Sequence, residues 1–84
     1  MTEYDETTPP FEPVADALRA VADRLERNDP DGPATLDVVM EVAEFVTKDA
    51  DQSVLAGMYA FVLTPDRGET NRQYAARLRA EVAQ

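Results

Sequence analysis

The spacing of the charged residues between Asp37 and Lys48 constrains the fold of this chain more than any other feature. These charged residues recur at intervals of four, three and four residues, and they are Asp37, Glu41, Glu44 and Lys48. At 100° per residue, that spacing places them on one narrow side of an α-helix. A strand would instead place Glu41 on the same face as Phe45. The sequence therefore predicts a helix over residues 35–48, with Thr35 as its N-cap and an apolar arc of roughly 220°.

The next segment is apolar on every side. No charged residue occurs from Val54 to Leu63, which indicates a buried helix over residues 51–63, with Asp49 and Gln52 at capping-box spacing before it. Its small residues, Ala56, Gly57 and Ala60, share one side and would let another backbone approach closely. A buried strand is the rival interpretation, but it needs partner strands, and no other segment alternates convincingly.

Two further helices are predicted from narrower apolar stripes. Residues 12–28 carry Val14, Leu18, Val21 and Leu25 on one side, with Pro13 in the first turn. Residues 70–83 begin with a capping-box pattern, Thr70 to Gln73, and present a seam of Tyr74, Leu78 and Val82. We expect this last helix to be only modestly anchored. Proline and glycine mark turns at residues 28–33 and 64–68, where Gly68 tolerates a positive φ.

Together these segments predict an all-α fold, a small antiparallel bundle of four short helices with a mobile N-terminal tail. Residues 1–10 are expected to be a disordered or extended acidic tail, because they are polar and end in two prolines. Residues 11–84 are expected to form a single helical domain. The broad apolar surfaces of helices 35–48 and 51–63 predict that these two are central.

The composition excludes much catalytic chemistry. The chain has no histidine and no cysteine, so it lacks the residues of nucleophilic triads, imidazole acid–base catalysis and most zinc or haem sites. Two Asp-x-Asp pairs, at Asp29 and at Asp49, begin like calcium loops but lack the required glycine and closing glutamate. We therefore expect no enzyme, no metal site and no cofactor.

The net charge of −9 is unevenly distributed. Residues 1–63 contain most of the acids, while residues 64–84 contain four arginines against three acids. Such acidity opposes attraction to nucleic acid and to anionic lipid. The longest apolar run is too short for a membrane span, and the first residues are acidic where a secretory signal would be basic. We expect a cytoplasmic protein, with nucleic acid and membranes as unfavourable partners.

The leading functional hypothesis is a non-enzymatic interaction or regulatory protein that binds another protein or a second copy of itself. Its candidate interface is the surface of helix 35–48, comprising Val38, Val42, Phe45, Asp37, Glu41 and Glu44. A first alternative is an acidic mimic of nucleic acid that blocks a basic protein surface. A second is DNA binding through the last helix, with Arg72, Arg77 and Arg79 as candidate phosphate contacts. No residue pattern identifies the partner.

Overall fold

A computed structural model describes residues 12–83, in which four helices form a small all-α bundle and no strand occurs. The helices are α1 (Glu12–Asn28), α2 (Leu36–Val46), α3 (Gln52–Phe61) and α4 (Asn71–Val82). The fold class predicted from the sequence is confirmed, and each helix lies within two residues of its predicted bounds. The predicted tail, residues 1–10, lies outside the described residues.

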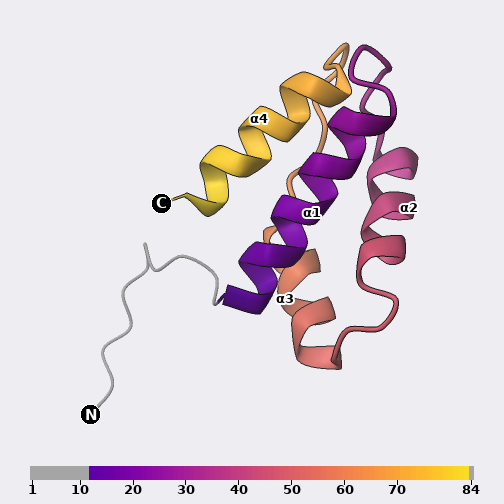
Figure 1. The fold of residues 1–84 in the computed structure, drawn as a ribbon. Coiled ribbons are helices and arrows are strands. Elements are labelled where there is room, and N and C mark those ends of the chain that lie inside the picture. The colour runs from indigo at the N-terminus through magenta and orange to yellow at the C-terminus, as the bar shows by residue number, and fades with distance from the viewer. Residues whose placement is uncertain (1–11, 84) are drawn as a thin grey trace.

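The central helix is α1. It packs against α2, α3 and α4, whereas these three have no Cα atoms within 8 Å of one another. Figure 1 shows α1 between α4 on one side and α2 and α3 on the other. The predicted stripe of α1 is fully buried, together with two alanines that let neighbouring helices approach; these core residues are Val14, Ala15, Leu18, Val21, Ala22 and Leu25.

The prediction that helices 35–48 and 51–63 are central is therefore wrong. Only Val39 and Ala43 of α2 and Met58 of α3 are buried. At 17 residues, α1 is about 25 Å long and has room for three neighbours. Apolar composition sets how much surface a helix could bury, but each of α2 and α3 has a single helical neighbour to bury it against.

The last helix is anchored more firmly than the sequence suggested, because α4 makes the most extensive contact with α1. Its predicted seam of Tyr74, Leu78 and Val82 is buried, as is Ala75. The Tyr74 hydroxyl donates a 2.6 Å hydrogen bond to the carbonyl oxygen of Leu63, in the loop that precedes α4. The apolar seam and this bond together fix α4 along α1.

Two of the three predicted helix caps are confirmed. The Thr35 hydroxyl accepts a hydrogen bond from the Val38 amide, and Thr70 forms a complete capping box with Gln73. Residues 49–53 offered several N-cap candidates for α3, and Asp51 is the one used, although its side chain accepts no capping bond. The capping box suggested by the spacing of Asp49 and Gln52 is therefore not formed. Gly68 adopts a φ of 77°, as its turn requires.

Backbone hydrogen bonds join the loop that follows α1 to the segment that leads into α4. The Ala34 amide donates to Glu69, and the Asn71 amide donates to Gly32, both at 2.8 Å. The Asn71 side chain adds a 2.8 Å bond to the carbonyl oxygen of Asp29. These bonds close the end of the α1–α4 pair and leave α2 and α3 on the other side of the molecule.

Candidate binding surface

The outward faces of α2 and α3, with the loop between them, form the part of the molecule that is least covered. We call it the α2–α3 surface, and it comprises residues 36–61. The three large hydrophobic side chains that are exposed within residues 12–83 all lie on it: Leu36 is 54% exposed, Phe45 47% and Phe61 37%. Leu36 and Phe45 lie on opposite sides of α2, because they are nine residues apart on the helix. The three side chains therefore share two helices and do not form one contiguous patch.

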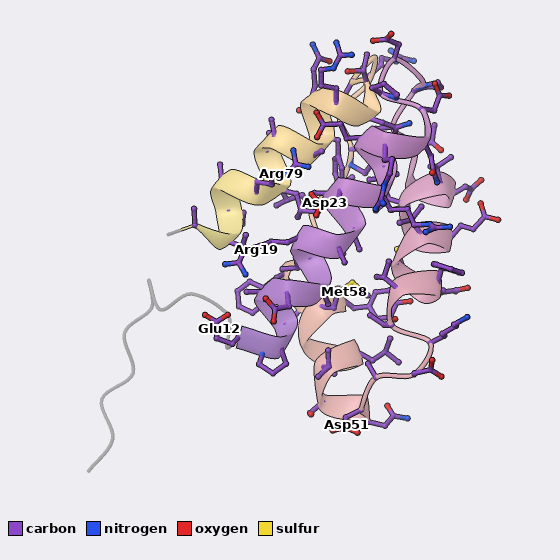
Figure 2. All side chains as sticks on the ribbon, viewed as in Figure 1. Glu12, Arg19, Asp23, Asp51, Met58 and Arg79 are labelled. Carbon is purple, nitrogen blue, oxygen red and sulfur yellow. The ribbon has the colours of Figure 1, made fainter. Side chains whose placement is uncertain are left out.

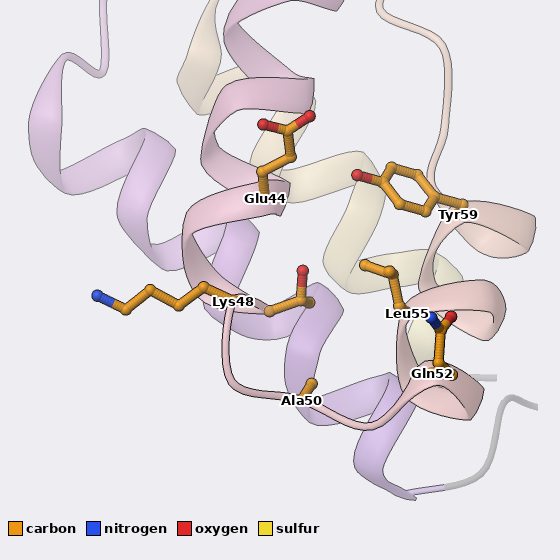
Figure 3. Close-up of a pocket in the computed structure, with 7 residues that line it drawn as sticks. Glu44, Lys48, Ala50, Gln52, Leu55 and Tyr59 are labelled. Atoms are coloured by element: carbon orange, nitrogen blue, oxygen red, sulfur yellow. The ribbon is translucent and has the colours of Figure 1, made fainter.

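A groove of about 420 Å³ separates the C-terminal part of α2 from α3. Figure 3 shows Tyr59 and Leu55 projecting from α3 toward the space beside Glu44. The principal lining residues are Glu44, Thr47, Lys48, Gln52, Leu55 and Tyr59. The buried Thr47 hydroxyl donates a 2.7 Å bond to the Ala43 carbonyl oxygen, which secures the end of α2 at the base of the groove. Apolar and polar groups are thus mixed along one open channel.

The predicted apolar interface residues lie on the opposite flank of α2. Val38 and Val42 are half-buried against the core, whereas the Phe45 ring is exposed beside two cations. The Arg24 guanidinium carbon lies 4.0 Å from the ring centroid, and the Lys48 amine lies 4.8 Å from it. Contacts of this kind are worth about 0.5–1 kcal/mol at exposed sites, so the ring is held while part of it stays accessible.

The surplus negative charge lies on α2 and on the loop that follows it. Asp37, Glu41 and Glu44 are exposed, as are Asp49 and Asp51. Within the part of the chain that the structure describes, none of these five carboxylates forms an ion pair. The predicted acidic strip is therefore an uncompensated edge of the α2–α3 surface.

The carboxylates of α1 are neutralised more fully. Arg19 pairs with Asp16 at 3.0 Å and with Glu12 at 3.9 Å. Asp23 and Glu26 each lie 2.7 Å from Arg79 of α4, and Figure 2 shows Arg79 and Asp23 directed toward each other across the two helices. These bonds raise the pKa of Arg79, with the bond to Asp23 as the largest cause. The α1–α4 side of the molecule thus satisfies most of its own charge.

The other two candidate phosphate contacts are also engaged within the chain. Arg72 lies 3.4 Å from Asp31. Arg77 donates two 2.8 Å hydrogen bonds to the Glu69 carboxylate and a third, of 2.9 Å, to the Thr64 carbonyl oxygen. Each of the three arginines therefore has an acidic partner within the chain in this structure.

Sequence reasoning assigned no role to Glu69, although its side chain is the most buried carboxylate among the ion pairs. The hydrogen bonds from Arg77 hold its pKa below the usual 4.5, assisted by a 2.9 Å bond from the Asp66 amide and opposed by burial. Only the turn at Gly68 brings Glu69 against α4, so no sequence periodicity could have identified this pair.

No metal-binding cluster adds a second candidate site among the described residues. Within residues 12–83, no three acidic side chains converge as metal ligands would, and none of the described helices has the length and apolar character to cross a membrane. Comparisons with known protein families, with curated proteins and with solved structures found no match to this chain. The α2–α3 surface is therefore the candidate site from which a function can be inferred.

Proposed function

We propose that this chain is a non-catalytic interaction domain that binds another polypeptide through the α2–α3 surface. The observation that carries the proposal is that the exposed large hydrophobic side chains among residues 12–83, Leu36, Phe45 and Phe61, all belong to the two helices that pack only against α1. The α1–α4 pair supplies a stable support behind them. A chain without histidine or cysteine is also better suited to binding than to proton transfer or nucleophilic attack.

The energetic basis is burial of apolar area that folding alone leaves in water. Removing apolar surface from water is favourable by roughly 25 cal/mol per Å², and aromatic anchors such as Phe45 and Phe61 contribute disproportionately at interfaces. The unpaired carboxylates at the edge of the surface would then steer the encounter and select the partner. A second copy of the chain is one form that the partner could take.

Two other functions receive less support. A nucleic-acid mimic needs closely spaced charges, but Asp37, Glu41 and Glu44 give about one charge per 5 Å of helix, against about one per 1.7 Å of duplex DNA. DNA binding through α4 requires Arg72, Arg77 and Arg79 to leave carboxylates that they already contact. Breaking these ion pairs would reduce the free energy gained from each phosphate contact.

The test is affinity capture from native-host extract with the tagged full chain, paired with sedimentation velocity to detect self-association. Leu36→Asp and Phe45→Asp each introduce a charge into the exposed apolar surface. Ala80→Asp introduces the same charge on the exposed side of α4 and is the matched control, and thermal melts confirm that all variants fold. We expect the partner, or the dimer, to be lost with the first two variants and retained with Ala80→Asp. A partner set and sedimentation coefficient that neither α2 variant alters would contradict the proposal.

A further inference from the structure

The groove of the α2–α3 surface is lined by mixed apolar and polar groups and lies between two helices whose Cα atoms stay more than 8 Å apart. On α3, Leu55 and Tyr59 line the groove and are half-buried against the core. On α2, the helical period places Leu36 and Met40 on the same side as Glu44, and Leu36 is the most exposed large hydrophobic residue described. The α3 wall of the groove thus offers two apolar side chains, and Leu36 and Met40 extend the apolar surface along α2 beyond the residues that line the groove.

Acidic residues outnumber basic ones around this groove. Glu44 lines the groove, and Asp37 and Glu41 follow it along α2. Asp49 and Asp51 are the sequence neighbours of Ala50, which lines the groove from the loop. The segment Gln52–Phe61 contains no charged residue at all. The one nearby base, Lys48, extends away from the groove in Figure 3, and its amine lies over the Phe45 ring.

We propose that the groove binds an amphipathic helix of a partner protein whose polar edge carries lysine or arginine. A helix is the element that packs against two others at once, at interaxial distances of about 8–10 Å, by placing apolar side chains between them. The 11 residues of α2 span about 16 Å, which matches roughly three turns of a bound helix. Basic residues on that helix would meet the unpaired carboxylates of α2.

A second copy of this chain does not supply such a helix. Each copy carries a net charge of −9, so pairing the same acidic surfaces is repulsive. The arginines of α4 are already committed, with Arg77 on Glu69 and Arg79 on Asp23 and Glu26. The inference rests on the proposed function and narrows it to one class of partner.

The test uses three fluorescein-labelled peptides of equal length, about five helical turns each. The first is an amphipathic leucine–lysine helix, the second has the same composition in scrambled order without an apolar face, and the third replaces lysine with glutamate. Fluorescence anisotropy with the full chain measures their binding at low and moderate salt. We expect the amphipathic lysine peptide to bind at least about tenfold more tightly than either of the others, with affinity that falls as salt rises.

Two variants then locate the site. Glu44→Lys should weaken the lysine peptide by about fivefold, since it replaces an attraction with a repulsion. Glu81→Lys makes the same charge change on the exposed side of α4 and should have little effect. Tyr59→Ala, which removes apolar area from the groove, should weaken binding without changing its salt dependence. Amide chemical-shift changes on peptide addition should cluster at residues 44–59.

The outcomes separate the two proposals. Equal binding of the scrambled peptide, equal effects of Glu44→Lys and Glu81→Lys, or shift changes centred on α4 would overturn this inference, because non-specific attraction to an acidic protein would then suffice. A captured partner that depends on Leu36 and Phe45 but is insensitive to salt and to Glu44→Lys would overturn the inference and leave the proposed function standing. Capture that no α2 variant alters overturns the proposed function.

Discussion

The backbone of α3 lies close to α1 at Gly57. Whether Gly57→Ala stabilises or destabilises the protein should therefore depend on the residue that it meets, Val14. A Cβ atom built at Gly57 would lie 2.6 Å from the Cγ2 atom of Val14, a fully buried side chain of α1. Contacts that short force side chains or backbone to move, at a cost of typically about 1–3 kcal/mol. Against this, alanine is favoured over glycine within a helix by about 1 kcal/mol. Gly57→Ala should therefore destabilise the protein by about 1 kcal/mol.

Removing the Val14 methyl group should turn the destabilisation by Gly57→Ala into a stabilisation. In a Val14→Ala background the methyl group that the new Cβ meets is absent, so Gly57→Ala keeps only its helical advantage and should stabilise by about 1 kcal/mol. The coupling between the two positions is then about 2 kcal/mol, as expected for residues in direct contact. Ala56→Gly, at an exposed position of the same helix, is the control and should cost about 1 kcal/mol in both backgrounds.

Urea denaturation followed by circular dichroism measures the free energies of unfolding of the four proteins in the Gly57–Val14 cycle and of the two control variants. For a domain of this size, 1 kcal/mol corresponds to a shift of about 4–8 °C in the melting temperature. Stabilisation by Gly57→Ala in the otherwise unchanged protein would refute the reasoning, since it would mean that the backbone of α3 does not approach α1 at this point. Equal effects in both backgrounds would refute it as well.

Three further predictions concern the α1–α4 side. Glu69→Gln should cost about 1–2 kcal/mol at pH 7, because it weakens charged hydrogen bonds from a partly exposed Arg77. The lowered pKa of Glu69 means that this contribution is present above pH 4.5 and lost on acidification, so urea titrations should show the gap to wild type closing as the pH falls below 4.5. Burial raises the pKa of Tyr74 to about 12 from 10.0, so the folded chain retains a proton that the unfolded chain releases, and stability should fall between pH 10 and 12 more steeply than in Tyr74→Phe. Thr70→Ala removes the capping box of α4 and should lower the free energy of unfolding by about 1 kcal/mol in thermal melts. An unchanged melting temperature would show that the cap does not stabilise the protein.

Helical periodicity predicted the elements well because it depends on local spacing. The stripe from Val14 to Leu25 and the seam from Tyr74 to Val82 are both buried as the spacing required. The caps at Thr35 and Thr70 also follow from residue type and position alone. Local chemistry thus suffices for the helices and most of their ends.

The spatial order of the helices could not be read in the same way. The apolar residues of α2 and α3 suggested a central position, yet the amphipathic α1 is central because its length gives each of the others a place to pack. The bonds that fix α4, from Tyr74 to Leu63 and from Asn71 to Asp29, join residues that are distant in the sequence. Such pairs leave no periodic pattern.

The candidate interface was predicted in part. The acidic strip of Asp37, Glu41 and Glu44 lies exposed, as spacing indicated. The groove beside it was not predicted, because it depends on the angle at which α3 departs from α2 and on Leu55 and Tyr59, which the sequence placed in the core. Composition alone could not distinguish an apolar helix that is buried on all sides from an apolar helix that packs against a single other helix.

The most direct test of the central claim, that α1 is the one helix covered by all the others while α2 and α3 keep open faces, is native-state hydrogen exchange followed residue by residue. Local openings free amides at energies that reflect how much packing each segment must lose. We predict that amides of α1, around Leu18 and Val21, exchange only through global unfolding, while those of α2 and α3 exchange through smaller openings at lower energy. Protection of α2 and α3 equal to or greater than that of α1 would contradict the account.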